Sequence, residues 1–102
     1  MANRLSLQAA LETILGSRNV YFQPPEDLKL TYPCILYERE KGEPFRADDS
    51  LYRYVKSYNV ILIDKNPDSA YPDLIMNSFK YCTFDRFYTA DNLNHYSFTL
   101  FY

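Results

Sequence analysis

Apolar residues near the start of the chain recur at the spacing of one face of an α-helix. Gly16 follows this run, at the position where a left-handed residue often ends a helix. Ser6 or Asn3 is suited to cap its start. The pattern predicts an amphipathic helix over about residues 5–15. Its apolar positions are Leu7, Ala10, Leu11, Ile14 and Leu15.

A second helical stripe follows a segment rich in turn-forming residues at positions 66–69. Pro72 fits a helix only in its first turn, so Asp68 or Ser69 is the expected N-cap. This stripe predicts a helix over about residues 70–79. Its members are Tyr71, Leu74, Ile75, Ser78 and Phe79.

The remaining ordered part of the chain consists of β-prone runs separated by turn residues. In the last run, every second residue from Tyr96 to Tyr102 is aromatic or aliphatic, as expected of a strand with one more buried face. Residues 90–94 are the expected connection to it. The predicted strands cover residues 20–22, 33–38, 52–64, 81–89 and 96–102.

The order of elements is therefore α-β-β-β-α-β-β, without internal repeats or linkers. We expect one α+β domain over residues 1–102, with an antiparallel sheet of about four to five strands and both helices on one face. The second and third strands should form an extended hairpin across the polar residues 41–50.

The amino-acid composition argues against several classes of function. Thirteen acidic residues outnumber eleven basic ones, so a strongly phosphate-binding surface is not expected. The chain has eleven Tyr and seven Phe, which would suit either a stacking platform for single-stranded nucleic acid or a protein interface. The net acidity favours the protein interface. The longest apolar run, residues 60–63, is too short to cross a membrane.

The residue types that carry catalysis are present without the spacing that catalysis requires. His95 is the only histidine, and we expect it to bind a loop carbonyl at a hairpin end. Cys34 and Cys82 are far apart and lack a C-x-x-C partner, so buried free thiols in a reducing compartment are expected. We expect no cofactor, no metal and no enzymatic activity.

Acidic residues could in principle gather into a two-metal nuclease site. Most of them occupy predicted turns, where the Asp side chain caps local backbone N–H groups. Asp85 and Arg86 are neighbours in a strand and should point to opposite faces of the sheet. The acidic residues considered are Asp48, Asp49, Asp64, Asp68, Asp85 and Asp91.

The segment from residue 41 to residue 51 is the candidate assembly interface. It is polar and long, yet it carries a large aromatic side chain that either folds back on its own hairpin or fills a pocket on a neighbouring subunit. Nearby charges would set the register of such a contact. The candidate residues are Phe45, Arg46, Asp48, Asp49 and Tyr52.

Several segments resemble short phage head-tail proteins. They are the Leu-rich opening helix, the run GSRNVYFQPP at residues 16–25, Tyr32-Pro33, the run IDKNPDS at 63–69 and the run RFYTADNLNH at 86–95. The element order with its long central hairpin also resembles siphophage tail-terminator and tail-completion proteins. These segments have the character of turns and strand ends and carry no chemistry.

The resemblance implies a non-enzymatic subunit that forms a ring, expected to be a hexamer, where the tail meets the neck. Its implied partners are other copies of itself, the tail tube protein and connector or head-closure proteins, with DNA passing through the lumen without specific binding. The implied location is the host cytoplasm during assembly and then the virion. Alternatives are a head-closure protein at another neck position and a small nuclease-like or nucleic-acid-binding protein.

Overall fold

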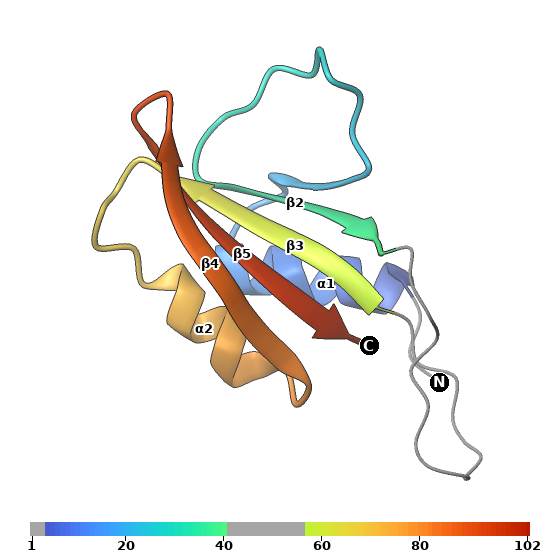
Figure 1. The fold of residues 1–102 in the computed structure, drawn as a ribbon. Helices are drawn as coiled ribbons and strands as arrows, with labels where there is room; N and C mark the ends of the chain where they lie inside the picture. The colour runs from blue at the N-terminus through green and yellow to red at the C-terminus, as the bar shows by residue number, and fades with distance from the viewer. Residues whose placement is uncertain (1–3, 41–56) are drawn as a thin grey trace, which may run out of the picture.

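The computed structural model describes residues 4–40 and 57–102, which form two helices and a five-stranded sheet (Figure 1). The α+β class and the order α-β-β-β-α-β-β are both confirmed. The elements are α1 (Arg4–Leu15), β1 (Val20–Phe22), β2 (Cys34–Arg39), β3 (Ser57–Asp64), α2 (Tyr71–Ser78), β4 (Cys82–Ala90) and β5 (Leu93–Phe101).

The strands lie in the order β1-β2-β3-β5-β4. Neighbours are antiparallel except for β1 and β2, which run parallel with Val20 opposite Ile35 and Phe22 opposite Tyr37. The sheet is thus mostly antiparallel, as predicted, with one parallel pair at its β1 edge. The connection over residues 23–33 explains the difference, because it is long enough to return the chain to the end of the sheet where β1 began.

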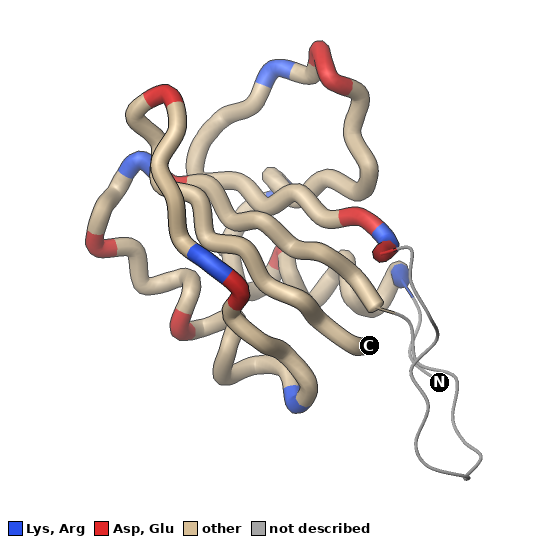
Figure 2. Tube along the Cα trace, in the orientation of Figure 1, with Lys and Arg blue, Asp and Glu red and all other residues tan. Residues whose placement is uncertain are grey.

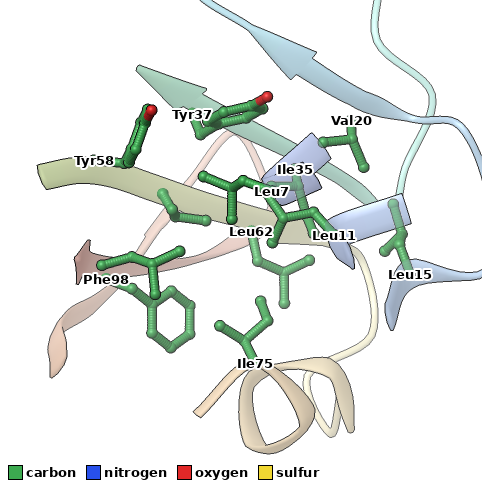
Figure 3. Close-up of a cluster of buried hydrophobic side chains, with 12 residues drawn as sticks. Leu7, Leu11, Leu15, Val20, Ile35, Tyr37, Tyr58, Leu62, Ile75 and Phe98 are labelled. Carbon is green, nitrogen blue, oxygen red and sulfur yellow. The ribbon is translucent and has the colours of Figure 1, made fainter. Parts of the chain in front are cut away.

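Both helices cover the same face of the sheet, as predicted, and their apolar residues join one core (Figures 1 and 3). From α1, Leu7 and Leu11 are fully buried, and from α2, Ile75 is fully buried. Burial of this kind supplies the main stabilisation of a domain of this size. The cluster comprises Leu7, Leu11, Leu15, Val20, Ile35, Tyr37, Tyr58, Val60, Leu62, Ile75, Phe98 and Leu100.

The predicted stripe of α2 is only partly buried. Leu74 is 45% exposed, whereas Ile75 is buried and Phe79 packs partly against the core. An eight-residue helix makes little more than two turns, so a contact centred on Ile75 leaves a neighbour 100° around the helix outside it. The N-cap is Ala70, not Asp68 or Ser69 as predicted, although Ser69 Oγ accepts the Tyr71 N–H at 3.3 Å.

A two-residue turn joins β4 to β5, where the sequence pattern predicted a longer connection. Asp91 and Asn92 adopt φ angles of 55° and 63°, the left-handed conformation that both central residues of a type I′ hairpin require. Asp and Asn tolerate this region better than most residues. Both strands consequently extend further toward the turn than expected.

A polar network ties α1 to the sheet. The Tyr37 hydroxyl donates to Gln8 Oε1 at 2.6 Å and accepts from Arg4 Nη1 at 3.2 Å. Gln8 Nε2 donates to Glu12 Oε2 and to the Val20 carbonyl, both at 2.9 Å. The buried tyrosine thus keeps its hydroxyl hydrogen-bonded, which avoids the cost of an unsatisfied polar group in the core.

Candidate assembly interface

The five residues predicted as the assembly interface lie outside the described residues. The structure therefore gives no positions for Phe45, Arg46, Asp48, Asp49 or Tyr52. The described part of the chain has its own candidates for an interface, namely its exposed large apolar side chains. These are Leu5, Leu74, Tyr81, Phe84 and Phe87.

Two of the exposed aromatic residues lie on β4, which forms one edge of the sheet (Figure 1). Phe84 is 46% exposed and Phe87 is 50% exposed. Each ring still packs against an aromatic ring of β5. The ring centres of Phe84 and Phe98 are 5.5 Å apart, and those of Phe87 and Tyr96 are 5.1 Å apart. The two rings therefore belong to the helix-covered face, at the place where the core reaches the surface.

A β-bulge explains how two phenylalanines three positions apart share a face. Phe84 is opposite Phe98 and Arg86 is opposite Ser97, so Asp85 is an extra residue in the ladder. The usual alternation of side chains is interrupted at this point, and both Phe84 and Phe87 point to the same side.

The same bulge places the two charged residues of β4 together on the other face. Asp85 Oδ2 accepts a hydrogen bond of 2.6 Å from the Thr99 hydroxyl, and Thr99 points away from the core. The Arg86 guanidinium lies 4.7 Å from the centre of the Tyr88 ring. The expectation that Asp85 and Arg86 occupy opposite faces was therefore wrong. The run Phe84-Asp85-Arg86-Phe87 is called the edge stripe below.

The face of the sheet away from the helices is poor in charge. Figure 2 shows strands that are mostly uncharged, apart from adjacent acidic and basic residues on β4 and at the end of β2. Tyr88 and His95 stack there with ring centres 4.7 Å apart and planes at 16°. A ring nitrogen of His95, Nδ1, lies 3.2 Å from the Leu93 carbonyl, consistent with the predicted contact to a loop carbonyl.

Neither cysteine has the properties of a nucleophile. Cys34 is fully buried and Cys82 is half-buried, and both are free thiols. Burial raises the pKa of each thiol to about 11, with Asp85 adding to the effect at Cys82. The thiolate is the reactive form, and the raised pKa disfavours it in both side chains at neutral pH.

The acidic turn residues of the described part serve local structure. Asp64 Oδ1 accepts the Asn66 N–H at 3.1 Å, and Asn66 Oδ1 accepts the Asp68 N–H at 2.9 Å. Asp64 is only 6% exposed. Within residues 4–40 and 57–102, no group of three His, Cys, Asp or Glu side chains is placed to hold a metal ion.

Comparison with known proteins adds no relative: no protein-family model matches the chain, and no curated protein matches it. Among the described helices, none has the length and apolar character needed to cross a membrane.

The edge stripe is the feature that sequence analysis missed. Its residues can be read in the sequence, but the sequence pattern indicates neither the edge position of β4 nor the bulge at Asp85.

Proposed function

We propose that the protein is a non-enzymatic phage structural protein, a tail terminator or head-tail joining subunit that assembles into a ring where the tail meets the neck. The observation that carries the assembly role is the edge of β4, where Phe84 and Phe87 are about half exposed beside the core. Large aromatic side chains at a sheet edge are typical of surfaces that another protein covers. The assignment to phage rests on the resemblance of the turn and strand-end segments.

The ring forms by head-to-tail contacts, which close when the rotation between subunits divides a full turn. A hexamer is the proposed size, with the tail tube protein and connector or head-closure proteins bound to its two sides. DNA passes through the lumen without specific binding, which the net charge of −2 supports because an acidic surface repels phosphates. The subunit would be made in the host cytoplasm and become part of the virion.

The segment proposed to reach a neighbouring subunit is tested by a double variant, Phe45→Ala with Arg46→Ala. If these side chains fill and orient a contact on the neighbour, their loss should abolish ring formation and head-tail joining. The melting temperature should then stay within about 2 °C of the parent, because side chains whose contacts are made on a neighbour add little to the stability of the free subunit. Size-exclusion chromatography with light scattering, a melting curve and phage complementation measure the three properties.

A matched control is Glu43→Ala, in the same polar segment. It should assemble as the parent does. Normal rings and normal phage yield from the double variant would contradict the role of Phe45 and Arg46. A large fall in melting temperature would instead place Phe45 in the folding core.

A further inference from the structure

We infer that the β4 edge binds the β4 edge of a second copy of this chain, antiparallel and around a two-fold axis between Asp85 and Arg86. The inference rests on the proposed function only in taking this edge as a protein contact. Because the contact is two-fold, it is separate from the head-to-tail contact that closes the ring. It adds the partner, the symmetry and the register of that contact.

The edge is open for such a contact. Among the described strands, β4 pairs with β5 on one side and has no strand on the other. It runs for nine residues, whereas the opposite edge, β1, has only three. An outer strand of this length presents a row of backbone N–H and C=O groups that a further strand can use.

The edge stripe is complementary to itself when two copies run antiparallel. A two-fold axis between Asp85 and Arg86 sets each Asp85 opposite Arg86 of the second copy. It also sets each Phe84 opposite Phe87 of the second copy. In a two-fold interface, a residue of the first copy contacts a second residue of the partner, and that second residue of the first copy contacts the first residue of the partner. The pairs named above meet this condition.

The bulge separates the charged pairs and the aromatic pairs onto opposite faces of the sheet. Because Asp85 and Arg86 share one face of β4, the two ion pairs would lie side by side on the face away from the helices. The four phenylalanine rings would meet on the helix-covered face, next to the two cores. Opposite charges and aromatic pairs directly across two strands both stabilise antiparallel pairing.

The charged pair also excludes other registers. Sliding one strand by one residue brings Asp85 opposite Asp85 of the second copy, or Arg86 opposite Arg86 of the second copy. A further step sets a charge opposite Phe84 or Phe87. Charged residues and bulges usually protect an edge from indiscriminate pairing. Here they permit pairing in the one register where both charges find an opposite charge.

A second copy fits this edge better than an unrelated strand does. The partner must supply a cation opposite Asp85 and an anion opposite Arg86, with an aromatic residue on each side. The edge stripe, read in the reverse direction, has that order. Both charges are already held in place, Asp85 by Thr99 and Arg86 by the Tyr88 ring, so little ordering is required on binding.

Charge exchange provides the test. Asp85→Arg sets Arg opposite Arg at both symmetric positions, and Arg86→Asp sets Asp opposite Asp. Each single variant should weaken the dimer of the free chain about tenfold or more. The double variant Asp85→Arg/Arg86→Asp should restore it, because each pair is again of opposite charge. Sedimentation equilibrium over a range of protein concentrations measures the dimer constant.

Mixing the two single variants gives the sharpest result. One strand then carries two Arg and the other two Asp, so the mixture should form a heterodimer about as tight as the parent dimer. Asp85→Asn, which keeps an acceptor for Thr99 while removing the charge, is the control for local structure. Melting curves establish that each variant is folded.

Three outcomes would overturn the inference: a parent chain that stays monomeric, single variants that dimerise as the parent does, or a double variant that is not restored. The second and third outcomes leave the proposed function intact if the parent forms rings and joins heads to tails. Conversely, a charge-dependent dimer from a chain that never forms a ring would support the two-fold contact and contradict the ring. The two proposals can therefore fail separately.

Discussion

The strands β4 and β5 are paired neighbours of nine residues each, yet they have opposite relations to solvent. In β5, Phe98 and Leu100 are completely buried beneath the helices. In β4, Phe84 and Phe87 are about half exposed, although each ring touches an aromatic residue of β5. The difference arises from position: among the strands of residues 4–40 and 57–102, β5 has a neighbour on both sides and β4 has one on a single side.

This comparison shows that aromatic residues on adjacent strands need not have the same role. A ring in the middle of the sheet is packed on all sides, so its removal leaves a cavity. A ring at the edge packs on one side only and leaves the other side for a partner. Substitutions that separate stability from association can therefore test the assignment of β4.

The largest effect is expected from Phe98→Ala. Phe98 is 0% exposed, so truncation should lower the free energy of unfolding by about 3 to 5 kcal/mol. The ring centre of Phe84 lies 5.5 Å from that of Phe98. Phe84→Ala should lower the free energy of unfolding by only about 1 to 2 kcal/mol. Urea unfolding of the two variants measures both values.

The paired design makes the comparison independent of residue type, because the same side chain is removed from two adjacent strands. Equal losses of stability would show that Phe84 is a core residue and that the β4 edge is not available for binding. A Phe84→Ala variant that folds normally but no longer associates would support the opposite conclusion.

Local chemistry made a large part of the fold predictable from the sequence. Gly16 ends α1 with φ at +76°, as its position after the apolar stripe predicted. The alternation in the last strand identified Phe98 and Leu100 as residues of the buried face. These features depend on spacing within one segment, so the sequence carries them directly.

Features that depend on which segments become neighbours were not predictable in this way. The parallel pairing of β1, the edge position of β4 and the bulge at Asp85 are set by the packing of the whole sheet. The bulge reversed the expected orientation of one charged residue, because an alternation rule assumes an uninterrupted ladder. The edge stripe could not be recognised as a site until both facts were known.

A second pair of variants compares the two sides of α2. Ile75→Ala should lower the free energy of unfolding by about 2 to 5 kcal/mol, because Ile75 is fully buried in the core cluster. Leu74→Ala should cost about 1 kcal/mol or less, because Leu74 is 45% exposed. The measurement is again urea unfolding. A larger loss for Leu74 than for Ile75 would mean that α2 turns Leu74, and not Ile75, toward the core.

An effect confined to alkaline pH concerns the buried thiol of Cys34. Burial raises the pKa of Cys34 from 9.0 to about 11, so the folded state retains its proton at a pH where the unfolded chain has lost it. The stabilisation is complete below pH 9 and is lost as the pH rises toward 11. The shift corresponds to about 2 kcal/mol of lost stability by pH 11.

Cys34→Ala is the control, because alanine has no proton to lose. The pKa values of Cys82, Tyr37 and Tyr96 are also raised by burial, so both proteins should lose stability at alkaline pH. The quantity to compare is therefore the slope of the unfolding free energy between pH 8 and pH 11, which should be steeper in the parent. Equal slopes would mean that the Cys34 thiol ionises as readily in the folded protein as in the unfolded chain. In that case a thiol reagent at pH 8 should label Cys34 without prior unfolding, whereas a buried, protonated thiol should react only after denaturant is added.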